Sequence, residues 1–111
     1  GEPVALLNDL RAFLAADGVS RRAAYHTLEW LDAQTLPAPE GDGAMLQSLL
    51  AYQLDRQAGS HAKGQANALA RRLTTLTVAQ PAGQRIAWLR NFISVAEFLA
   101  REVRSSAADA P

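Results

Sequence analysis

Few side chains in this sequence have the types and the spacing that catalysis or metal binding requires. His26 and Glu29 are three residues apart, so on a helix they would share one face and could begin a metal site. A carboxylate-bridged di-iron site needs several more carboxylates and a second histidine from facing helices, and we find no such set. The chain has no cysteine, which excludes disulfides, thiolate nucleophiles and cysteine-based zinc sites. We therefore expect no metal and no cofactor.

The second histidine, His61, lies close to a lysine in the sequence. His61 is followed by Lys63 and Gly64, which is similar to the His-x-x-Lys-Gly motif of phosphotransfer domains. Here the histidine and the lysine are two residues apart instead of three, which turns the lysine by about 100° on a helix. No nucleophile has a recognisable base partner, and residues 41–43 lack the pattern of a phosphate-binding loop. These observations predict that the protein is not an enzyme.

The segment 18–36 reads GVSRRAAYHTLEWLDAQTL and combines a serine N-cap with a basic and aromatic N-terminal part. It resembles the recognition helix of winged-helix DNA-binding proteins, in which Val-Ser-Arg is followed by tyrosine and by leucines at helical spacing. The resemblance implies that four side chains face the major groove of DNA, namely Arg21, Arg22, Tyr25 and His26. A DNA-binding transcriptional regulator with a helix-turn-helix-like segment at 18–36 is therefore the alternative function.

The net charge is zero, but the charges are distributed unevenly along the chain. Residues 1–55 carry three arginines and eight carboxylates, whereas residues 56–111 carry eight bases and three carboxylates. The two halves can pair within one chain or across a dimer. Alternatively, the basic half presents Arg71 and Arg72 to phosphates or to an acidic protein partner. The sequence leaves both readings open, and a pI near 6.9 makes nucleic acid the less favoured partner.

Composition and periodicity predict an all-α fold. The chain has 23 alanines and 16 leucines against five valines and two isoleucines, a balance that favours helices over strands. We read the strand-like run Thr74–Val78 as a helix end, because a lone strand would have no partner. Apolar residues recur at helical spacing in five segments, and we expect helices over 3–16, 21–34, 44–58, 63–76 and 84–104.

We expect these helices to form one compact domain over residues 3–104, a bundle of four to five helices with the longest at the C-terminal end. A flexible tail is expected over 105–111, where the residues are small and polar. The apolar stripes also predict which side chains face the core: Leu6, Leu7, Leu10, Phe13, Leu14, Ala24, Leu28, Leu31, Met45, Leu46, Leu49, Leu50, Leu54, Ala66, Leu69, Ala70, Leu73, Leu76, Ile86, Leu89, Phe92, Ile93, Ala96, Leu99 and Val103.

The last helical segment is apolar on more than one side. Trp88, Val95 and Phe98 lie beside its main stripe, and such a helix is either central in the fold or shared with a partner. Tryptophan is also enriched at protein interfaces. We therefore expect a small non-enzymatic interaction or regulatory domain that self-associates as a homodimer through these three residues. Arg71 and Arg72 form a second candidate surface for a protein partner.

Two further expectations concern source and location. Ten arginines against one lysine, together with the abundant alanine, suggest a bacterial genome rich in G and C. No run of residues is long and apolar enough to cross a membrane, and no secretory signal is recognisable, so we expect a soluble cytoplasmic protein.

Overall fold

The structure is a computed structural model that describes residues 1–16, 43–58 and 63–109. In these ranges the chain forms four α-helices, α1 (Glu2–Ala15), α3 (Ala44–Ala58), α4 (Lys63–Val78) and α5 (Arg85–Asp109). A short 3-10 helix, η2 (Ala82–Gln84), lies between α4 and α5. The described ranges contain no strand, which confirms the expected all-α class. The expected C-terminal position of the longest helix is confirmed as well, since α5 has 25 residues.

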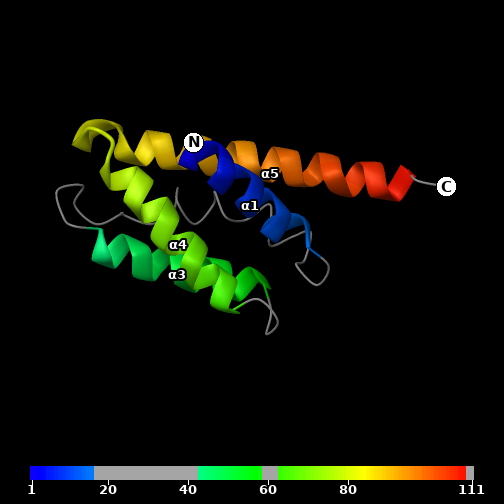
Figure 1. Cartoon of the computed structure of the whole chain (residues 1–111), viewed down its shortest axis with the longest axis horizontal. Coiled ribbons are helices and arrows are strands. Elements are labelled where there is room, and N and C mark those ends of the chain that lie inside the picture. Colours follow the sequence, from blue (N-terminus) through cyan, green and yellow to red (C-terminus); the bar gives the residue numbers. More distant parts are fainter. Residues whose placement is uncertain (17–42, 59–62, 110–111) are drawn as a thin grey trace.

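The helices are arranged mainly as two pairs. α3 packs along α4, and α1 packs along α5, while α4 makes smaller contacts with α1 and α5. Figure 1 shows α5 running along one side of the molecule, with α3 and α4 on the other side. The C-terminal turns of α5 extend beyond α1, α3 and α4 in this view (Figure 1). Ala87, Asn91, Ser94 and Phe98 are all exposed and follow one another at helical spacing along one side of α5.

Leucines from all four helices meet in the core. The most deeply buried are Leu6, Leu10, Leu14, Leu50, Leu73 and Leu89. Buried alanines complete the inner faces of α4 and α5, and their small side chains let neighbouring helices approach: Ala66, Ala70, Ala96 and Ala100. Most side chains that the periodicity placed inside are indeed buried or half-buried. The core therefore follows from the apolar stripes of the sequence.

Two side chains that we expected to face the core are exposed instead. Met45 is 65% exposed and Ile86 is 40% exposed. Each lies in the first turn of its helix. Leu46, Leu49 and Leu50 provide the covered side of α3 in place of Met45. Ile86 follows η2, whose three residues are all exposed.

The helix bounds agree closely with those expected. α3 begins and ends at the expected residues, and α4 continues to Val78, so the reading of Thr74–Val78 as a helix end is confirmed. α5 continues to Asp109 and so enters the segment 105–111, whose flexibility stays a prediction. The helix expected over 21–34 lies outside the described residues.

The corner between α4 and α5 is held by the guanidinium group of Arg85. Its Nε donates to the carbonyl oxygen of Gln80 at 3.1 Å, and its Nη2 donates to that of Val78 at 2.8 Å. The last carbonyls of a helix have no partner within the helix and carry partial negative charge. An arginine in the first turn of α5 therefore satisfies the C-terminal end of α4 and fixes where α5 begins.

Candidate functional site

The outward side of α5 carries large apolar side chains. Leu89, Ile93, Ala96 and Ala100 are buried and follow one another at helical spacing, so they define the side of α5 that faces the core. Phe98 comes from nearly the opposite side of the helix and is 54% exposed. Val95, one turn earlier, is 39% exposed. Phe98 and Val95 are neighbours on the helix surface, and contiguous exposed apolar side chains, unlike single ones, mark contact surfaces.

Trp88 lies differently from the other two residues expected in this surface. Its ring stacks on Phe92 with the centroids 5.1 Å apart and the planes 27° apart. Both rings are half-buried and pack against the hydrophobic core. Trp88 therefore contributes to the stability of the fold, and only part of its surface remains exposed.

A shallow hollow opens on α5 two turns before Phe98. Its lining comes from Ala87, Arg90, Asn91 and Ser94, all of which are exposed. These positions have the spacing i, i+3, i+4 and i+7, which is the diamond that receives a side chain from a neighbouring helix in knobs-into-holes packing. The sequence analysis did not single out these residues. The signal that could have found them is the small size of Ala87 and Ser94 at this spacing.

The second candidate surface contains two arginines, of which Arg72 forms salt bridges within the chain. Arg72 Nε donates to Glu2 Oε1 at 2.6 Å, and Arg72 Nη1 donates to Asp9 Oδ2 at 2.7 Å. The hydrogen bond to Glu2, followed by the one to Asp9, raises the pKa of Arg72 above its ordinary value. Arg71, the neighbouring residue on α4, is exposed. Arg72 therefore has a role inside the fold, and its role as a partner contact stays a prediction.

This arginine also answers part of the question raised by the uneven charge. The two acids are on α1, in the acidic half of the sequence, and Arg72 is on α4, in the basic half. At least this pairing of the two halves occurs within one chain.

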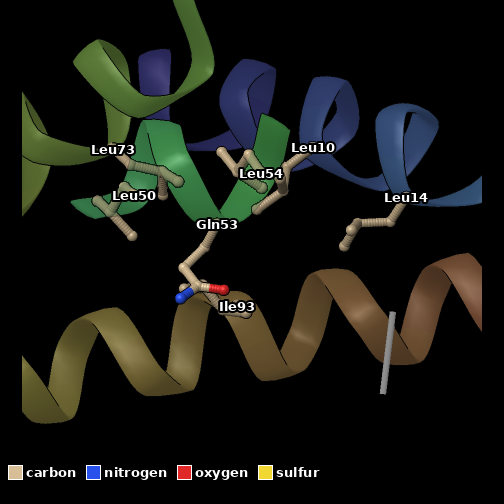
Figure 2. A pocket seen from close by; sticks show the side chains of 7 residues that line it. All are labelled: Leu10, Leu14, Leu50, Gln53, Leu54, Leu73 and Ile93. Carbon is tan, nitrogen blue, oxygen red and sulfur yellow. The ribbon is translucent and has the colours of Figure 1, made fainter. Parts of the chain in front are cut away.

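The core contains a small apolar cavity where the four helices meet. Its lining consists of Leu10, Leu14, Leu50, Gln53, Leu54, Leu73 and Ile93. Figure 2 shows the Gln53 side chain reaching from α3 toward Ile93 on α5. The cavity measures about 10 Å³, which is at most the room for one water molecule. It is a gap in the packing rather than a binding site for a ligand.

One exposed surface was missed because Met45 was assigned to the core. Met45 and Tyr52 are exposed on the same side of α3, and Arg56 follows one turn after Tyr52. The Arg56 guanidinium carbon lies 5.6 Å from the centroid of the Tyr52 ring, within cation–π distance. This surface and the outward side of α5 belong to different helices, which makes Tyr52 a useful reference for Phe98.

Another residue that the sequence did not distinguish is Glu97. It is 2% exposed, so its carboxylate belongs to the interior of the fold rather than to the outward side of α5. Sequence periodicity places position 97 beside the inner stripe, but it does not reveal that a charged group is enclosed there.

The remaining candidates lie outside the described residues. Arg21, Arg22, Tyr25 and His26, the side chains of the DNA-binding alternative, fall in the segment 17–42. The described part of the chain contains no group of three or more metal-binding side chains. In the same part, no helix is both long and apolar enough to cross a membrane.

Comparison with protein-family models, with curated proteins and with solved structures finds no match for this chain.

Proposed function

We propose that this protein is a small non-enzymatic interaction or regulatory domain, and that it self-associates through the outward side of α5. The observation that supports the proposal is the exposure of Phe98 and Val95 on the longest described helix. Removing such side chains from water contributes about 25 cal/mol for each Å² of apolar surface buried, and the entropic cost of association is subtracted from that gain. Aromatic residues at the centre of an interface commonly contribute most of that energy.

Trp88 belongs to the proposed surface only in part. Because it stacks on Phe92 and packs on the core, only the exposed remainder of its ring is open to a partner. Phe98 and Val95 therefore contribute most of the apolar contact. Arg71 is retained as a second contact, for an acidic partner, because it is exposed on α4.

The alternative function is DNA binding through Arg21, Arg22, Tyr25 and His26, and it rests on the sequence alone. The two functions predict different responses to the same variants. Loss of phosphate contacts in Arg21→Ala/Arg22→Ala weakens binding to duplex DNA and lowers its salt dependence by about one for each lost contact. The same variant leaves self-association through α5 unchanged.

The direct test is the molar mass of the protein in solution across a range of concentrations. We expect a concentration-dependent increase from monomer to dimer for the natural sequence. Phe98→Ser should raise the dissociation constant at least about tenfold, which corresponds to roughly 1.4 kcal/mol of lost contact energy.

A matched control is Tyr52→Ser, which removes a comparably exposed aromatic side chain from α3. It should leave the dissociation constant within about twofold of the natural value. A natural protein that stays monomeric at high micromolar concentration contradicts the proposal. Equal effects of the two variants would show that general surface hydrophobicity, and not the α5 surface, causes the association.

A further inference from the structure

We propose that two copies of this chain pair their α5 helices antiparallel, with Phe98 of each copy inserted into the hollow formed by Ala87, Arg90, Asn91 and Ser94 of the other. The inference rests on the proposed self-association and adds its geometry. Both the protruding side chain and the hollow that can receive it lie on the outward part of one helix. A surface that carries both parts is complementary to a second copy of itself.

Phe98 and the hollow lie at different heights along α5 but on nearly the same side of the helix. The centre of the hollow is about 7.5 residues before Phe98, which is roughly 11 Å along a helix that rises ~1.5 Å per residue. On the helix circumference, the two directions differ by only about 30° when successive residues turn by ~100°. A neighbouring helix laid along this side therefore meets both features.

The second step is symmetry. A two-fold axis perpendicular to α5 and close to Ser94 places Phe98 beside the partner's hollow, and it places the partner's Phe98 beside this hollow at the same time. The contact is isologous, so both insertions occur in one closed dimer. Asn91 then lies beside the partner's Phe98, and Ala87 lies beside the partner's Glu102.

The third step is the comparison with a parallel pair. In that arrangement each residue meets its own counterpart, so Phe98 lies beside the partner's Phe98 and each hollow faces the other hollow. Glu102, which is exposed, also meets the partner's Glu102, and like charges repel. The antiparallel pair avoids both features. It also places the two helix dipoles side by side in opposite directions, so that the positive end of each lies near the negative end of the other, which is favourable.

The side chains of the hollow suit an aromatic ring. Ala87 and Ser94 are small and let two helix backbones approach each other closely. Arg90 borders the hollow, and an arginine beside an aromatic ring adds a cation–π contribution. Because each dimer contains two such insertions, a change in either the ring or the hollow is counted twice.

The absence of cysteine from the natural sequence allows a direct test by disulfide cross-linking. A disulfide requires Cα atoms roughly 4–7 Å apart. In the antiparallel pair, Ser94→Cys should cross-link with itself, because position 94 is next to the two-fold axis. Ala87→Cys and Glu102→Cys should each stay uncross-linked alone, since identical positions are then roughly 22 Å apart. A mixture of these two variants should form the mixed disulfide.

The outcomes separate the geometry from the proposed function. Efficient self-cross-linking of Ala87→Cys identifies a parallel pair, which overturns this inference while self-association remains. A dimer by mass in which none of the three variants cross-links places the interface on another surface, such as that of Tyr52. A protein that is monomeric by mass overturns both proposals. The molar mass of each variant is first measured in solution under reducing conditions, to verify that the variant still associates.

A second variant tests the hollow without a cross-link. Ala87→Trp fills the space that the partner's Phe98 would occupy, and position 87 is exposed, so the fold is expected to tolerate it. We expect the dissociation constant to rise at least about tenfold. Ala5→Trp, at an exposed position of α1, is the matched control and should have little effect. Unchanged association of Ala87→Trp would overturn the insertion of Phe98 into the hollow.

Discussion

Gly43 and Thr74 approach each other so closely that no β-carbon fits between them. A β-carbon built on Gly43 would be 2.6 Å from Thr74 Cγ2 and 2.9 Å from Val78 Cγ1, both on α4. The backbone of Gly43 also has a φ of 89°, a conformation that disfavours other residues. Glycine at this position therefore lets the N-terminal end of α3 lie directly against α4.

Replacing this glycine should destabilise the protein strongly. Gly43→Ala combines a positive φ with a clash against side chains that have little freedom on a helix. We expect the free energy of unfolding to fall by about 2–4 kcal/mol, measured by urea unfolding. Gly64→Ala is the control, because nothing lies within 4 Å of its β-carbon, and it should be neutral or slightly stabilising.

The clash itself can be tested by a double-mutant cycle. Thr74→Ser removes Cγ2, so in the Gly43→Ala background it should recover part of the lost stability. Strictly additive effects of the two substitutions would show that Thr74 Cγ2 adds nothing to the cost of Gly43→Ala, which then comes from φ and from the contact with Val78.

Arg72 should stabilise the contact between α1 and α4. Arg72→Met removes the hydrogen bonds to Glu2 and Asp9, and since these groups are partly exposed we expect a loss of only about 1 kcal/mol. Arg72→Lys should recover less than the full amount, because one ammonium group lacks the fork that reaches both acids. Urea unfolding at low and high salt measures the effect, which should shrink as salt screens the charges.

The neighbouring arginine provides the control for this prediction. Arg71→Met removes the same charge from the same helix at an exposed position, and it should change the free energy of unfolding by less than about 0.5 kcal/mol. Equal losses for both variants would mean that the charge of α4, and not the bridge to α1, is responsible.

Arg85 should determine the stability of the corner between α4 and α5. In Arg85→Met the carbonyl oxygens of Val78 and Gln80 lose their charged donor, and we expect a loss of about 1–2 kcal/mol in urea unfolding. The stability of Arg85→Lys should lie between those of the natural protein and Arg85→Met, because lysine cannot donate to both oxygens with the same geometry. An unchanged free energy of unfolding in Arg85→Met would show that water replaces the guanidinium group as hydrogen-bond donor without loss of stability.

Features of the fold that depend on a single segment could be predicted from the sequence, whereas features that depend on how different helices pack could not. The bounds of α3 and the helical state of Thr74–Val78 follow from propensity and periodicity within a single segment. The exposure of Met45 does not, because periodicity gives an apolar sector of a helix but not which edge of that sector the neighbouring helix covers. The partners of Arg72 lie 63 and 70 residues away, so only the packing of α1 on α4 reveals them.

The candidate site shows the same division. Sequence periodicity placed Val95 and Phe98 outside the inner stripe of α5, and both are exposed. It placed Trp88 with them, since residues 88, 95 and 98 are neighbours on the helix surface. The stacking of Trp88 on Phe92 and its contact with the core depend on which other helices surround α5, and the sequence alone does not specify them.

Trp88 and Phe98 should therefore separate stability from association. Trp88→Ala removes a half-buried ring from its stack on Phe92, and we expect a loss of about 2–3 kcal/mol, less than for a fully buried tryptophan. Phe98→Ala should change the stability of the monomer by less than about 0.5 kcal/mol, because the residue is already 54% exposed. Urea unfolding at several protein concentrations distinguishes the two, since dimerisation raises the midpoint as concentration increases. The natural protein and Trp88→Ala should keep this concentration dependence, whereas Phe98→Ala should lose it; a concentration dependence that survives Phe98→Ala would remove Phe98 from the interface.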